Sequence, residues 1–169
     1  MNVEYIFLHE INITTILKKL NILIALFVIC VSCTPKNEYS KRTTPNPLIG
    51  TWKLISGTTI EGRDTTVTDY TKNQEMIKII NRTHFSFLNH DLNNGKDSTA
   101  IFVAGGGTYT VKDSLYIENL EYCSHRGWEN NSFSFVYTVN GDTLITKGIE
   151  KIEDMGVNHI NIEKLVRVK

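Results

Sequence analysis

From Leu48 onward, apolar and polar residues alternate with the two-residue period of β-strands and not with the period of a helix. The clearest run is 133–139, in which the odd-numbered positions are all aromatic or apolar and share one face. Asn140-Gly141 follows directly and is a strong signal for a hairpin turn. We therefore expect a strand over 133–139 and its returning partner over 143–147.

The same pattern recurs through the rest of this region. Residues 107–111 and 114–122 predict a second hairpin that turns at Lys112-Asp113. Further strands are expected at 51–56, 77–80, 84–88, 100–103 and 159–168, and loops at 61–64 and 93–95. Residues 68–80 can also begin as a short helix, because Gln74, Glu75 and Met76 favour helices.

This count, about eight to nine strands at short spacing, predicts an all-β barrel or sandwich. Closure into a barrel leaves no exposed sheet edge. A barrel of about eight strands has an interior that side chains fill or that holds one small ligand. Gly105-Gly106-Gly107 has no following Gly-Lys-Ser/Thr and no strand–glycine–helix unit, so it predicts a β-bulge or a barrel corner and not a phosphate loop.

The N-terminal segment has the pattern of an export signal. Lys18 and Lys19 precede an apolar run, 20–31, which is shorter than the roughly 20 residues of a membrane-spanning helix. The run ends in Cys30-Val31-Ser32-Cys33, which resembles the lipobox of bacterial lipoproteins, in which a small residue precedes the lipidated cysteine. The resemblance implies lipid on Cys33, export, and a place on the outer membrane or on a membrane facing the periplasm. An uncleaved anchor is the alternative.

These features predict three regions: a signal peptide at 1–32, a lipidated flexible tether at 33–47, and a β domain at 48–169. Glu4, His9 and Glu10 are unusual ahead of a signal, so translation starting nearer Lys18 is an open alternative. The tether is rich in Lys, Thr, Asn and Pro and nearly free of apolar residues, so it cannot bury enough surface to fold.

Gly50-Thr51-Trp52 at the start of the domain and Arg167 near its end resemble the lipocalins, in which a Gly-x-Trp packs under an arginine of the closing strand. The order and spacing of 105–110, 116–122, 133–144 and 163–168 are similar to lipocalin-like lipoproteins of Bacteroidetes-type bacteria, many of unknown function. The resemblance covers about 48–169. It implies an antiparallel up-and-down β-barrel outside the cytoplasm, with Gly50, Trp52 and Arg167 in structural roles.

Composition excludes nucleic-acid binding by charge as the function. The 169 residues contain 18 basic and 18 acidic residues, and residues 1–32 hold two of each, so the domain is neutral too. A neutral domain has no electrostatic footprint for nucleic acid. The sequence does not say whether the protein has a protein partner, and it predicts no cofactor and no metal.

No set of residues predicts catalysis. The histidines, His84, His90, His125 and His159 among them, lack metal-ligand spacing. Cys123 is the domain's single cysteine, and its neighbour His125 faces the same side of a regular strand, but a small buried thiol is the commoner role for such a residue. We therefore do not expect an enzyme.

The remaining hypotheses are a binding module for a small hydrophobic or amphipathic ligand and a filled barrel that acts as a structural or interaction module of the cell envelope. A binding module needs a mostly apolar wall with a few polar groups. Glu118 is a candidate anchor if it faces inward, and His84 and Tyr122 are expected near the mouth. The candidate ligand-binding residues are His84, Tyr109, Tyr116, Glu118, Tyr122, Phe133, Phe135 and Tyr137.

Overall fold

The computed structural model describes residues 46–169, which form nine strands and two short 3₁₀ turns. The predicted signal peptide, Cys33 and residues 34–45 of the tether lie outside the described residues. The strands are β1 (Gly50–Glu61), β2 (Asp64–Asp69), β3 (Gln74–Ile80), β4 (His84–Asp91), β5 (Phe102–Lys112), β6 (Leu115–Cys123), β7 (Asn131–Asn140), β8 (Thr143–Ile152) and β9 (Val157–Arg167). The 3₁₀ turns are η1 (Arg126–Trp128) and η2 (Glu153–Met155).

Every strand pairs antiparallel with its neighbour, and the sheet closes on itself. The order runs from β3 to β9 without a crossover, and β9 then pairs with β1, which also pairs with β3. Eight strands therefore form a closed up-and-down barrel, which confirms the predicted fold class. The one strand outside this barrel, β2, pairs only with the second half of β1, from Ser56 to Glu61.

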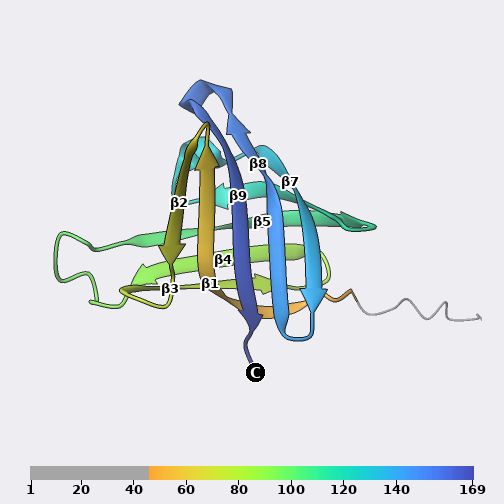
Figure 1. Ribbon diagram of the computed structural model, residues 1–169, viewed down its shortest axis with the longest axis horizontal. Coiled ribbons are helices and arrows are strands. Elements are labelled where there is room, and N and C mark those ends of the chain that lie inside the picture. Colours follow the sequence, from red (N-terminus) through yellow and green to blue (C-terminus); the bar gives the residue numbers. More distant parts are fainter. Residues whose placement is uncertain (1–45) are drawn as a thin grey trace, which may run out of the picture. The chain divides into compact units, whose positions relative to one another are not determined.

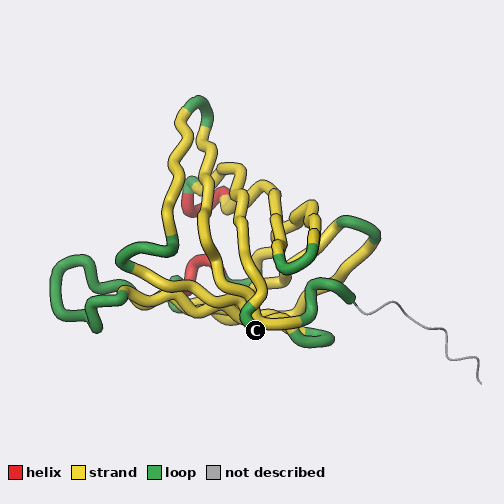
Figure 2. The backbone as a smooth tube through the Cα atoms, turned by 60° about the horizontal axis from the view of Figure 1, so that its bottom comes forward, coloured by secondary structure: helices red, strands yellow, loops and turns green. Residues whose placement is uncertain are grey.

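The strands lie in two layers that cross. In Figure 1, β1, β2, β7, β8 and β9 run vertically, and β3, β4 and β5 run nearly at right angles behind them. Figure 2 shows the β1–β2 hairpin projecting beyond the rest of the barrel wall. Residues Thr44–Lys169 form a compact unit that contains all nine strands and the described core, so this span meets the requirements for folding by itself.

Several local predictions are confirmed. The β7–β8 hairpin turns at Gly141, whose φ of 58° suits glycine. The β5–β6 hairpin turns at Asp113, with a φ of 55°. The alternative of a short helix over 68–80 is wrong, because residues Gln74–Ile80 form β3 and alternate between buried and more exposed positions.

The predicted glycine bulge is present between β5 and β6. Gly106 pairs with Tyr122 while Gly107 pairs with Leu120, so Glu121 is an extra residue in β6. A Cβ at Gly106 or Gly107 would overlap backbone atoms of the adjacent strands, which explains the choice of glycine.

One end of the barrel is closed by a tryptophan. The Trp52 indole is fully buried, its Nε1 donates to the Leu48 carbonyl at 2.8 Å, and the Arg167 guanidinium lies over its ring. Arg167 also donates to the carbonyls of Ile49 and Pro47, at 2.9 Å each. At Gly50 a Cβ would overlap the guanidinium, and φ is 148°, so this position favours glycine. The packing that the lipocalin resemblance implies, with Trp52 under Arg167 and Gly50 beside them, is therefore present.

Candidate functional site

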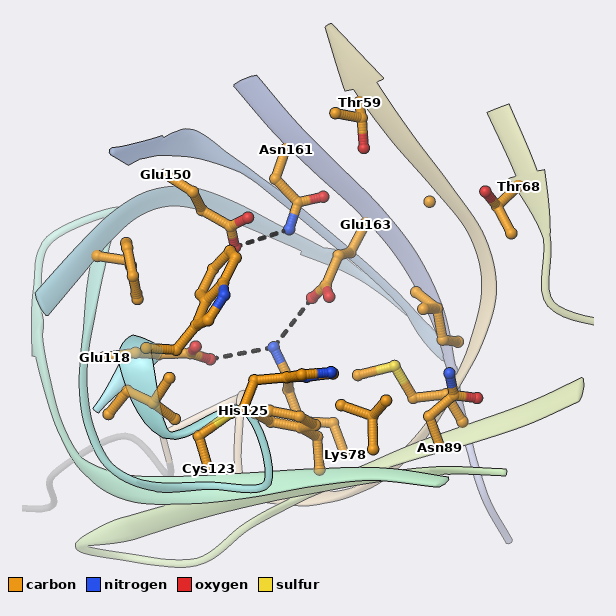
Figure 3. Close-up of a pocket in the computed structure, with 18 of the residues that line it drawn as sticks. Thr59, Thr68, Lys78, Asn89, Glu118, Cys123, His125, Glu150, Asn161 and Glu163 are labelled. Carbon is orange, nitrogen blue, oxygen red and sulfur yellow. Dashed lines mark hydrogen bonds and ion pairs between the residues drawn. The ribbon is translucent and has the colours of Figure 1, made fainter. Parts of the chain in front are cut away.

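A cavity of about 480 Å³ lies inside the barrel, and Figure 3 shows its polar residues in close-up. Binding pockets for small molecules generally measure about 300–1,000 Å³, so this volume suits a small ligand. Its lining comes from the closed barrel, from β2 and from η1. The lining includes Thr68, Tyr70, Lys78, Phe87, Asn89, Glu118, Leu120, Cys123, His125, Trp128, Phe133, Phe135, Glu150, His159, Asn161 and Glu163.

Strand alternation and the bulge decide which β6 side chains face the cavity. Glu118 and Leu120 are two residues apart and both line it. The extra residue Glu121 then reverses the alternation, so that Cys123 is buried against the cavity while Tyr122 is exposed.

Three charged side chains from distant strands meet at the cavity wall. The Lys78 ammonium on β3 donates to Glu118 Oε1 on β6 at 3.0 Å and to Glu163 Oε2 on β9 at 2.9 Å. All three residues are less than a tenth exposed: Lys78 is 4% exposed, Glu118 is 7% exposed and Glu163 is 9% exposed. The dashed lines in Figure 3 mark both bonds. We call these residues the buried ion triad.

One ammonium serves two carboxylates in this triad. Burial raises the pKa of the Glu118 carboxyl, which the Lys78 charge only partly opposes and the Glu163 charge reinforces. Burial alone would lower the pKa of the Lys78 ammonium, but the two carboxylates outweigh it and raise that pKa. The triad therefore holds a firmly protonated lysine that two carboxyl groups share, and one of these, Glu118, has a raised pKa.

A second polar group lies on β8 and β9. Glu150 Oε2 is 2.8 Å from His159 Nε2, and Glu150 Oε1 accepts a hydrogen bond from Asn161 Nδ2 at 3.0 Å. The Glu150 and His159 side chains are 15% and 18% exposed, more than the triad, and both line the same cavity. Tyr70 lines the same cavity, and its pKa is raised, first by burial and then by the charges of Glu163 and Glu150.

Aromatic side chains supply much of the remaining wall. Phe133 and Phe135 are buried on β7 and face the cavity, and Phe87 and Tyr70 line it from β4 and the β2–β3 turn. Trp128 of η1 packs on Phe133 with ring centroids 5.7 Å apart. The wall is therefore largely aromatic, with the polar groups gathered on parts of it.

Two buried polar atoms have no hydrogen-bond partner among the described residues: Asn89 Oδ1 and the Tyr116 hydroxyl. Asn89 lines the cavity and is 7% exposed, and its Nδ2 is already engaged by Gln74 Oε1 at 3.2 Å. An unpaired buried acceptor is costly, so Asn89 Oδ1 favours an occupant that donates a hydrogen bond. The Tyr116 pKa is raised by burial and then by the Glu118 charge.

Of the eight candidate ligand residues, Glu118, Phe133 and Phe135 line the cavity. Tyr109 and Tyr116 are buried outside its lining, with ring centroids 5.3 Å apart. The Tyr109 hydroxyl donates to the Asn81 carbonyl at 2.6 Å. These two tyrosines are packing residues in this structure.

The other three candidates lie away from the cavity. The Tyr137 hydroxyl donates to the Asp113 carbonyl at 3.2 Å beside the β5–β6 turn. The expected positions of His84 and Tyr122 near the mouth are corrected: both are exposed and line a separate depression on the surface. His84 precedes the inward Phe85 and so points outward, and the bulge at Glu121 turns Tyr122 outward.

Reasoning from the sequence did not identify Lys78, Glu163, Glu150, His159 and Asn161 as site residues. A signal existed for two of them. Lys78 has the strand parity of the buried Met76 and Ile80, and Glu163 has the parity of the buried Leu165. A charged residue at such a buried position must be paired with an opposite charge, and Lys78 and Glu163 are partners of each other.

The Cys123-Ser124-His125 segment has a buried thiol and an exposed imidazole, both on the cavity lining. Within residues 46–169 no cluster of His, Cys, Asp and Glu suited to a metal is found. The same span contains no helix of the length and apolarity needed to cross a membrane. No family profile, curated protein or solved structure matches the chain.

Proposed function

We propose that this protein is a lipid-anchored lipoprotein outside the cytoplasm whose barrel binds a small amphipathic molecule. The observation that carries the binding proposal is the cavity of about 480 Å³, with aromatic walls and buried polar groups at defined places. Apolar walls with a few fixed polar groups are the usual composition of small-molecule sites.

The closed end supports the relation to lipocalin-like lipoproteins. Trp52 of the first strand and Arg167 of the last strand are paired in register and in contact. This arrangement seals one end, so that a ligand enters from elsewhere and its apolar part is shielded from water. The anchoring proposal rests on the apolar run and Ser32-Cys33 of the sequence.

The alternative is a structural module with a filled interior. Its requirement is that side chains leave no room for a ligand, and a space of about 480 Å³ favours binding instead.

Titration of residues 44–169 with phenylnaphthylamine, an uncharged fluorescent probe, tests the binding proposal. We expect saturable binding with an increase in probe fluorescence. Thr68→Trp places a large ring at a position on β2 that lines the cavity, and it should weaken binding at least about tenfold. Thr65→Trp is the matched control, because Thr65 is exposed on the same strand with the opposite parity.

Saturable binding that Thr68→Trp weakens and Thr65→Trp leaves unchanged supports the cavity as the site. The absence of saturable binding by the unmodified domain would contradict the proposal and favour the structural module.

A further inference from the structure

The charged groups of the cavity are mainly carboxyl groups. Glu118, Glu150 and Glu163 present carboxylate oxygens, and Asn89 presents the buried, unpartnered Oδ1. Among the described residues of the lining, Lys78 is the sole lysine or arginine, and two of its three N–H groups already bind Glu118 and Glu163. The cavity therefore has more carboxyl groups than lysine or arginine side chains to pair with them.

The charges of the lining point the same way. Three carboxylates of the lining, Glu118, Glu150 and Glu163, face the single ammonium of Lys78. Glu150 also lies 2.8 Å from the His159 imidazole. Figure 3 shows Glu118, Glu150 and Glu163 on the same cavity from three different directions. An added positive charge would lie near three carboxyl groups in a partly enclosed space, where electrostatic attraction is stronger than in bulk water.

We propose that the ligand of this cavity is a small organic amine, with a protonated amino group and an apolar or aromatic body. This inference rests on the proposed binding function and specifies the chemistry of its ligand. The ammonium supplies donors for the carboxylates and for Asn89 Oδ1, and the body packs on the aromatic wall. The faces of Tyr70, Trp128 and Phe133 add attraction for a cation through their π-electrons.

The same features disfavour a ligand with a carboxylate end, such as a fatty acid. Its carboxylate would approach Lys78 only beside the two carboxylates that already bind it. It would also leave Asn89 Oδ1 without a donor. A neutral alcohol satisfies an acceptor but gains no charge interaction.

The test compares phenylbutylamine, phenylbutanol and phenylbutyrate, which share one body and differ only in the polar end. Their affinities for residues 44–169 are measured by calorimetry at neutral pH. We expect the amine to bind at least about tenfold more tightly than the alcohol, and the acid to bind more weakly than the alcohol. Equal or weaker binding of the amine, with the alcohol or acid still bound, overturns this inference and leaves the proposed function standing. No binding of any of the three overturns both.

Glu150→Gln tests the charge directly, since it keeps the size and removes the negative charge at a partly exposed position. It should weaken phenylbutylamine binding about fivefold or more and leave phenylbutanol within about twofold. The control is Glu153→Gln, an exposed position on η2 that pairs with Lys151 and lies outside the cavity lining. Equal loss of amine and alcohol affinity in Glu150→Gln would overturn the role of its charge and with it the inference.

Discussion

The guanidinium carbon of Arg167 lies 4.1 Å from the centroid of the Trp52 ring. The two residues are paired in register on β1 and β9, the strands whose pairing closes the barrel. The contact therefore joins the first and last strands of the closed sheet at the point where the indole seals one end.

Trp52→Ala removes this seal and leaves a large void. The free energy of unfolding should fall by about 3–5 kcal/mol, as for other buried large aromatic residues. The measurement is urea denaturation of residues 44–169, with Trp128→Ala as a comparison at a half-buried tryptophan. A Trp52→Ala variant as stable as the unmodified domain would show that the indole does not hold the barrel together.

Lys78→Met tests the buried ion triad. It leaves Glu118 and Glu163 as buried carboxyl groups without their cation, so the free energy of unfolding should fall by about 3–5 kcal/mol at neutral pH. Lys164→Met, at the exposed position next to Glu163, is the control and should change stability by less than about 0.5 kcal/mol. Adding Glu118→Gln and Glu163→Gln to Lys78→Met should recover part of the loss, and a further loss would contradict the role assigned to the charges.

The pKa of Glu118 predicts how stability depends on pH. Because burial raises this pKa above the ordinary 4.5, the folded protein binds the Glu118 proton more tightly than the unfolded chain does. The resulting stabilisation is present below pH 4.5 and is lost as the pH rises through the raised pKa. Urea denaturation across this range should show the unmodified domain losing stability relative to Glu118→Gln as the pH rises. A stability difference that is constant with pH, or that changes in the opposite direction, would contradict the raised pKa.

Cys33→Ala tests the proposed anchor in the full chain. Stable attachment by lipid takes more than one acyl chain, and the substitution removes the residue that would carry them. We expect the domain to move from the membrane fraction to the soluble fraction, or the precursor to remain uncleaved. Cys30→Ala is the control and should leave the fractionation unchanged. Membrane attachment of Cys33→Ala with an intact N-terminus would instead favour an uncleaved anchor.

The fold could be predicted where strands alternate strongly and turns have specific residues. Residues 133–139 and Asn140-Gly141 predicted β7 and its hairpin, and the three glycines predicted the bulge. β2 was not predicted, because in Asp64–Asp69 Val67 is the one large apolar residue, and it is 67% exposed. Such a strand forms through backbone pairing with β1 and not through burial.

The candidate site was predicted less completely, for two physical reasons. A single inserted residue, Glu121, reverses the faces of β6 beyond Leu120, so regular alternation misplaced Tyr122. The buried ion triad brings together residues up to 85 positions apart, and barrel closure alone makes Lys78, Glu118 and Glu163 neighbours. The sequence made Glu118 a candidate only on the condition that it faces inward, because both faces of β6 mix polar and apolar residues. Its partners depend on contacts between strands that no local pattern encodes.

If the interior of the barrel is a ligand site, the amide chemical shifts of the domain locate the bound ligand most directly. Residues 44–169, labelled with nitrogen-15, would be titrated with phenylbutylamine and with phenylbutanol. Binding inside the barrel should give saturable shifts at the cavity residues Leu120, Phe133 and Glu163, and unchanged signals at the outward-facing His84 and Tyr122. Saturable shifts confined to the outer surface, or none with either compound, would contradict it.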